Sequence, residues 1–210
     1  MSSAVSVPEN RVTLTNVLWA QYLAVLGEHE HDGRVAFYQG ILEIITVGFE
    51  HESIKRLISR LIDHYALARD VDIHPGGNFT MKREEFQSGI EADDCFYIQS
   101  IAKLRSLQEI SLPQDPPPDL AIEVGITNPS IDKLAIYAAI GVPEIWRYRD
   151  GSVDVLLLKP DGSSYVSSPT STCLPDFPIP ALDEALEGLR GGKSSNVLVK
   201  DFAKRIGRIG

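Results

Sequence analysis

Acidic residues within a strongly apolar segment are the first sign of chemistry in this sequence. Segment 119–125 has the pattern of a β-strand, and its alternation places Asp119, Glu123 and Gly125 on one face and aliphatic residues on the other. A carboxylate that is buried in such a strand without a partner is costly. We therefore expect Glu123 either to reach solvent at a sheet edge or to bind a cation.

A lysine follows on the next predicted helix, which spans about residues 128–140. Lys133 leads the stripe that continues through Ile136 and Tyr137, so it belongs to the inward face of this helix. The helix dipole disfavours a cation in the first turn. Lys133 therefore either has an acidic partner in the interior or lies beside Asp132 and reaches solvent.

The strongest periodic pattern in the chain predicts a helix over about residues 50–69. In the phase of this helix Glu50 and His51 face the sheet, whereas Glu52 points toward water. The alternatives are a favourable negative charge near the helix N-terminus for Glu50 and a hydrogen-bonded core position for His51.

Two adjacent aspartates, Asp93 and Asp94, lie at the start of a predicted strand over residues 92–98. Neighbouring strand residues point to opposite faces, so at most one of the two can join Glu123 in a shared site. The sequence does not choose between them. If the pair belongs only to a turn, both carboxylates are simply solvated.

Together these groups indicate one kind of chemistry. Glu123 and one aspartate would hold a divalent cation, Mg²⁺ or Mn²⁺, which polarises a phosphoryl oxygen and lowers the pKa of a bound water. Lys133 would orient that water or stabilise developing negative charge. Glu50 and His51 would have auxiliary roles.

The elements that would position these residues alternate between strands and helices. The pattern also predicts a helix over 15–26, a hairpin of 34–38 with 41–47, strands at 71–74, 78–83 and 144–148, a hairpin of 153–158 with 165–166, and helices at 181–190 and 197–206. We expect a mixed α/β (α+β) architecture with a central sheet flanked by helices. The whole chain, 1–210, would form a single domain with its core at about 30–170, an N-terminal helix and a C-terminal helical extension.

Composition limits the class of protein. The chain has 210 residues, of which 43% are hydrophobic, and a net charge of −9. No apolar run approaches the roughly 18 residues of a membrane span, and Cys95 and Cys173 have no metal-like spacing, so we expect a cytoplasmic protein without a membrane partner. The acidic charge argues against a simple cationic nucleic-acid binder. Any affinity for DNA without metal should be weak and lowered by salt.

Five segments, taken in order, resemble the bacterial Uma2 (Uma-two) family, which is assigned to the restriction endonucleases of the PD-(D/E)-x-K nuclease superfamily. They are 34–43 (RVAFYQGILE), 50–52 (EHE), 89–98 (GIEADDCFYI), 117–127 (PPDLAIEVGIT) and 132–148 (DKLAIYAAIGVPEIWRY). The resemblance covers about residues 12–190. It implies a restriction-endonuclease-like core, a mixed sheet flanked by helices, with the active site at one end of the sheet.

The resemblance also implies roles for individual residues. Asp93 and Glu123 match the two acidic half-motifs and would bind Mg²⁺ or Mn²⁺. Lys133 looks like a catalytic lysine that has moved onto the following helix. Glu50 and His51 match the acidic and histidine positions at the start of the N-terminal helix of the core.

Two positions depart from the family motif. Ala92 stands in place of the proline before the first aspartate, and Gly125 stands in place of the usual lysine. Our leading hypothesis is a metal-dependent DNA endonuclease, and by analogy we expect a homodimer. The alternative, suggested by Gly125 and the acidic charge, is a catalytically silent nuclease-like scaffold that binds a protein or a nucleic acid.

Overall fold

The computed structural model describes residues 10–27, 33–106, 108–125 and 131–207. The helices are α1 (Trp19–Gly27), α2 (Phe49–Arg69), α3 (Lys133–Ile140), α4 (Ile179–Arg190) and α5 (Ser195–Ile206), with short 3₁₀ turns at Glu84–Phe86 and Ile101–Lys103. The strands are β1 (Asn10–Leu14), β2 (Arg34–Tyr38), β3 (Ile41–Thr46), β4 (His74–Pro75), β5 (Thr80–Arg83), β6 (Ser88–Glu91), β7 (Asp94–Tyr97), β8 (Leu120–Val124), β9 (Glu144–Arg149), β10 (Ser152–Leu158) and β11 (Tyr165–Ser168).

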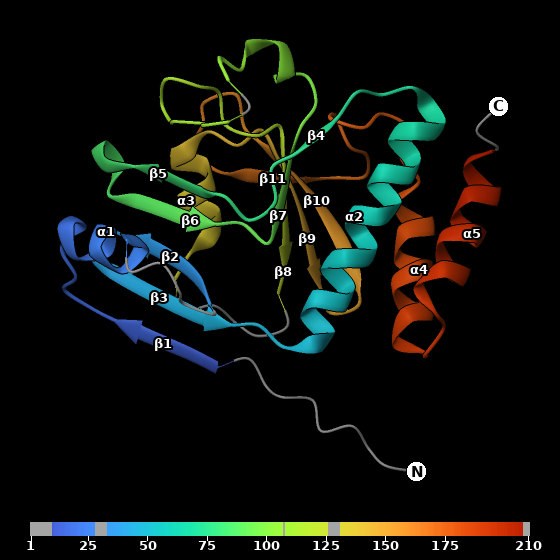
Figure 1. Cartoon of the computed structure of the whole chain (residues 1–210), viewed down its shortest axis with the longest axis horizontal. Helices are drawn as coiled ribbons and strands as arrows, with labels where there is room; N and C mark the ends of the chain where they lie inside the picture. Colours follow the sequence, from blue (N-terminus) through green and yellow to red (C-terminus); the bar gives the residue numbers. More distant parts are fainter. Residues whose placement is uncertain (1–9, 28–32, 107, 126–130, 208–210) are drawn as a thin grey trace.

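Within the described ranges the strands form two sheets (Figure 1). The first has five antiparallel strands in the order β1-β3-β2-β6-β5. The second has six strands in the order β11-β10-β9-β8-β7-β4 and is mixed, because β8 and β9 run parallel while their neighbours are antiparallel. The predicted α/β class with a mixed sheet flanked by helices is confirmed, and its strands are divided between two sheets.

The chain passes from the first sheet to the second at Ala92 and Asp93, between β6 and β7. The predicted strand over 92–98 therefore begins two residues later, at Asp94. The predicted strands leave residues 84–91 without a strand, yet β6 forms there, although Gly89 is a poor strand former. In the fold the ring of Tyr22 packs against Gly89 and leaves no space there for a Cβ.

The hairpin of β2 and β3 follows the prediction. Tyr38 pairs with Ile41, and the two turn residues, Gln39 and Gly40, both have positive φ angles, of 46° and 86°. This is the backbone that a two-residue hairpin turn requires, and glycine adopts it without strain.

Helix α2 begins at Phe49 and ends at Arg69, close to the predicted bounds. Helix α3 instead begins at Lys133, and the side chain of Asp132 caps it by accepting hydrogen bonds from the amides of Leu134 and Ala135 at 3.1 and 3.2 Å. The predicted start at 128–130 lies outside the described residues. At the N-terminal end, the helix predicted over 15–26 is α1, which begins at Trp19, and β1 precedes it over Asn10–Leu14, where no strand was predicted.

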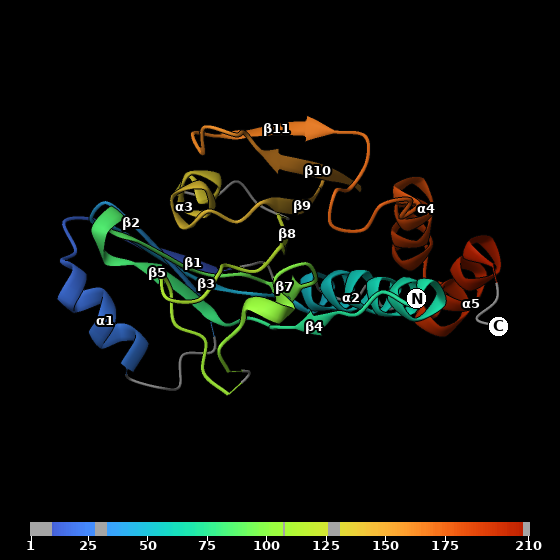
Figure 2. The same cartoon turned by 90° about the horizontal axis from the view of Figure 1, so that it is seen from above.

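The mixed sheet is covered on both faces (Figure 2). On one face α2, α4 and α5 enclose a core that includes Ile122 and Trp146. On the other face α3 lies between the two sheets and packs against Ala121 and Ile145. Strand β8 is buried along its whole length, so the polar side chains at its end lie in the interior. None of the described helices is long and apolar enough to cross a membrane.

Glu144, at the start of β9, is fully buried and connects this strand to the segment before α4. Its carboxylate accepts hydrogen bonds from the indole of Trp146 at 2.6 Å, from the amide and hydroxyl of Thr172 at 2.8 and 2.7 Å, and from the amide of Cys173 at 3.1 Å. Four donors therefore depend on one side chain.

Replacing Glu144 with alanine is expected to lower the free energy of unfolding by about 3 to 5 kcal/mol, because the buried donors lose their acceptor. Urea unfolding of the variant measures this loss. Glu187→Ala removes an exposed glutamate on α4 and should change stability by less than about 0.5 kcal/mol. Equal effects of the two substitutions would contradict the assigned role of Glu144.

Candidate active site

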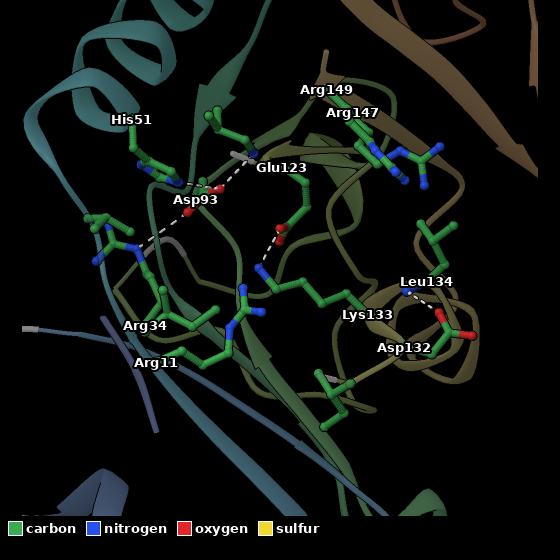
Figure 3. Close-up of a pocket in the computed structure, with 15 residues that line it drawn as sticks. Arg11, Arg34, His51, Asp93, Glu123, Asp132, Lys133, Leu134, Arg147 and Arg149 are labelled. Carbon is green, nitrogen blue, oxygen red and sulfur yellow. Dashed lines mark hydrogen bonds and ion pairs between the residues drawn. The ribbon is translucent and has the colours of Figure 1, made fainter. Parts of the chain in front are cut away.

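A pocket lies where the ends of β8 and β9, the start of α3, and the first sheet meet (Figure 3). Three of the predicted site residues, Asp93, Glu123 and Lys133, line it. His51 also lines it, at the first turn of α2. The predicted residues that line the pocket thus come from four separate parts of the chain.

Asp93 lies at the crossing between the sheets and is 3% exposed. Its Oδ2 accepts a hydrogen bond from the amide of Val124 at 2.8 Å and lies 3.1 Å from Nε2 of His51, while its Oδ1 lies 3.8 Å from Nε of Arg34. Burial alone would raise the pKa of this carboxyl, but the hydrogen bond from His51, the charge of Lys133 and the Val124 amide outweigh burial and lower the pKa. Asp93 is therefore held as an anion.

Asp94 points away from this pocket. It accepts a hydrogen bond from the hydroxyl of Ser59 on α2 at 2.5 Å and pairs along the sheet with Ile122 rather than with Glu123. The choice that the sequence left open is thus decided in favour of Asp93 as the aspartate beside Glu123.

Glu123 is 4% exposed, and both of its carboxylate oxygens have partners on α3. The ammonium of Lys133 donates to Oε2 at 2.7 Å, and the hydroxyl of Tyr137 donates to Oε1. Burial and the charge of Asp93 raise the pKa of Glu123, and Lys133 opposes this shift. The expected acidic partner of Lys133 is therefore Glu123.

Lys133 is the first residue of α3, where the helix dipole opposes a positive charge. Burial also favours its neutral form, but the charges of Glu123 and Asp93 outweigh burial and raise the pKa of Lys133. The lysine is thus a fixed cation in the interior. Its position one helical turn before Tyr137 lets both side chains reach the same carboxylate.

Of the two predicted residues at the start of α2, only His51 reaches the pocket. His51 is 2% exposed, whereas Glu50 is exposed and does not line the pocket. The expectation that Glu50 faces the sheet is wrong. In the first helical turn its carboxylate can remain in water and still interact favourably with the helix dipole, so nothing requires its burial.

The walls of the pocket are strongly cationic. Its positively charged side chains are Arg11, Arg34, Lys133, Arg147 and Arg149. Its carboxylates are Asp93, Glu123 and Asp132. The local excess of positive charge contrasts with the net charge of −9 for the chain.

The sequence reasoning missed these arginines and Tyr137. The arginines come from β1, β2 and β9, so no run of basic residues marks them in the sequence. Two signals were available: Arg147 and Arg149 are two residues apart on one strand, and Tyr137 is four residues after Lys133 on one helix.

The donor set of this pocket fits a hard divalent cation. Asp93 and Glu123 are oxygen ligands, and Mg²⁺ is commonly held by one or two carboxylates with waters and a substrate phosphate as the remaining ligands. Within the described residues, no group of three or more His, Cys, Asp or Glu side chains is placed to hold a metal ion. Asp93 and Glu123 would be the protein ligands of such a cation.

A mixed sheet flanked by helices, with two carboxylates and a lysine at the end of its parallel strands, defines a restriction-endonuclease-like fold. The chain belongs to the Uma2 family, described as "Putative restriction endonuclease", whose model matches residues 19–194. No curated protein sequence matches the chain.

The substitution Lys133→Met tests the buried ion pair. Without the ammonium, Glu123 is left buried without its cation, which is expected to cost about 3 to 5 kcal/mol when the carboxylate is ionised. Because the pKa of Glu123 is raised in the folded state, the folded variant binds a proton that the unfolded chain has released, and its stability falls as the pH rises above the ordinary pKa of a glutamate, about 4.3.

Urea unfolding across this pH range measures the effect. The double variant Lys133→Met/Glu123→Gln has no carboxylate to protonate, so it should lack the added pH dependence. Parallel pH profiles for wild type and Lys133→Met would show that the pair does not behave as a buried ion pair.

Proposed function

We propose that this protein is a Mg²⁺- or Mn²⁺-dependent endonuclease that hydrolyses phosphodiester bonds in DNA. The observation that carries the proposal is the pocket in which Asp93 and the Glu123–Lys133 pair lie together between cationic walls. Buried carboxylates repel an anionic substrate unless a metal ion neutralises them. Carboxylates, a metal ion and a fixed cation together are typical of metal-assisted phosphodiester hydrolysis.

Asp93 and Glu123 would hold the metal. When bound, the cation supplies Lewis acidity to a phosphoryl oxygen and lowers the pKa of a coordinated water. Binding requires Glu123 to turn at least one oxygen from its partners on α3 toward the cation. Tyr137 can keep its hydrogen bond to the other oxygen and so orient the carboxylate.

Lys133 would act on the reacting groups. Its raised pKa keeps it protonated, so its ammonium can orient the attacking water and stabilise the negative charge that develops on the phosphoryl oxygens. His51 acts through Asp93 and is a positioning residue, because its ring nitrogen holds Oδ2 on one side while the Val124 amide holds it on another.

One observation favours a second candidate function, a silent nuclease-like scaffold. Both oxygens of Glu123 already have partners, and Gly125, which also lines the pocket, supplies no side chain. Metal binding separates the two candidates.

Cleavage of both DNA strands would need two sites, so we propose that the active form is a homodimer.

Plasmid nicking in the presence of Mg²⁺ or Mn²⁺ tests the nuclease. Asp93→Asn, Glu123→Gln and Lys133→Met are each expected to reduce the rate by about 100-fold or more, because the first two remove carboxylates that would hold the metal and the third removes the cation that would stabilise developing negative charge. Asp94→Asn is the matched control, since it changes the adjacent aspartate on the opposite side of the strand and should nick like wild type. Equal rates for wild type and Glu123→Gln would refute the assignment of Glu123.

A second control tests the placement of the lysine. A Cβ at Gly125 would have the carbonyl oxygen of Tyr148, at 3.7 Å, as its nearest contact, so a side chain fits there. Gly125→Lys/Lys133→Met should therefore recover part of the activity that Lys133→Met loses. If the double variant is no more active than the single one, the ammonium is needed specifically from α3.

Metal binding itself is measured by thermal unfolding with and without Mn²⁺. A cation that binds only the folded state adds about 2.7 kcal/mol at 100 times its dissociation constant, so Tm should rise in wild type. Asp93→Asn should abolish the rise, and Asp94→Asn should keep it. A wild-type Tm that does not respond to Mn²⁺ or Mg²⁺ would favour the scaffold.

A further inference from the structure

Two arginines of β9 line the pocket beside the proposed catalytic residues. Arg147 and Arg149 project from the same face of the strand, whereas Trp146 and Tyr148 project from the other face into the core. The parallel pairing of β8 with β9 sets Arg147 opposite Glu123. Arg149 follows about 6.6 Å further along the strand. The two guanidinium groups therefore extend the pocket beyond the carboxylates.

The opposite wall carries Arg11 and Arg34, which are committed to buried acids (Figure 3). Nε of Arg11 lies 3.3 Å from the carboxylate of Glu43, which is fully buried, and Nε of Arg34 lies 3.8 Å from that of Asp93, while Nη2 of Arg34 also pairs with the partly exposed Glu52 at 3.5 Å. If these arginines turned toward a ligand, the acids would lose compensating charge in the interior. Arg11 and Arg34 therefore stabilise the acids of the site and do not bind the substrate.

Arg147 and Arg149 have much weaker ties. They pair with Asp154 at 2.9 Å and with Asp150 at 3.2 Å, and these two acidic side chains are 45% and 88% exposed. Ion pairs with exposed acids contribute only about 0 to 1 kcal/mol, so exchanging them for a ligand costs little.

We propose that Arg147 and Arg149 form a subsite for a backbone phosphate of the DNA strand, next to the phosphate that is cleaved. The inference rests on the proposed function. A guanidinium group is charged at every accessible pH, and its planar fork matches two phosphate oxygens. Neither arginine is paired with Asp93 or Glu123. The subsite should therefore strengthen binding of substrate and transition state alike and act on KM rather than on kcat.

The test is DNA binding by Arg147→Gln/Arg149→Gln, measured by fluorescence anisotropy with a fluorescein-labelled DNA duplex in EDTA over a series of salt concentrations. Affinity should fall by about 10-fold or more, because the charged hydrogen bonds of two guanidinium groups to the phosphate are lost. The slope of log K against log salt should become shallower by about 1 to 2, because fewer phosphates are neutralised. In nicking assays KM should rise while kcat stays close to wild type.

The matched control is Lys204→Gln/Arg205→Gln, which removes two cations of α5 that also pair with exposed acids. It makes the same change in net charge and should bind DNA like wild type. Equal binding by the two double variants, or a fall in kcat with unchanged KM, would overturn the subsite.

The outcomes also separate the two proposals. If wild type cleaves DNA and the arginine variant binds normally, only the subsite is wrong. If wild type binds DNA without cleaving it and the arginine variant binds more weakly, the subsite is supported and the nuclease is refuted. A wild-type chain that neither binds nor cleaves DNA refutes both.

Discussion

The site depends on one buried anion. Asp93 lies where the chain leaves one sheet and enters the other, and a carboxylate at such a position is tolerated only if donors surround it. Those donors are the amide of Val124 at the end of β8 and the ring of His51 on α2, with Arg34 of β2 close by. Satisfying this one group thus fixes the relative positions of both sheets and the long helix.

The same requirement accounts for a lysine in an unfavourable place. Lys133 is partly buried at the first residue of α3, where burial and the helix dipole both oppose its charge. The placement is stable because the carboxylate of Glu123 is buried and has no other cation within 4 Å among the described residues. Tyr137, one turn later, completes the set of donors around Glu123. Each member of this group is costly alone and is compensated by the others.

Local periodicity predicted the elements whose structure depends on residues close together in the sequence. The bounds of α2, the β2–β3 hairpin and the inward phase of Glu123 and Lys133 all follow from spacing alone. The split into two sheets did not, because it depends on where residues 92 and 93 leave one ladder for the next. Glu50 shows the limit of helical phase: at a helix end, a charged residue near the apolar stripe can remain in water. The choice of Asp93 over Asp94 required knowing which residue pairs with Ile122.

Net charge was the least informative property of the sequence. Taken over the whole chain, −9 argues against DNA, yet the field that a substrate meets is set by charges within about 8 Å at physiological salt. Five cationic side chains and three carboxylates line the pocket, and a metal ion on Asp93 and Glu123 would shift this balance further toward positive charge. If the proposed function holds, the acids elsewhere would act as a repulsive background that limits nonspecific binding, so that DNA would be attracted chiefly to the cleft.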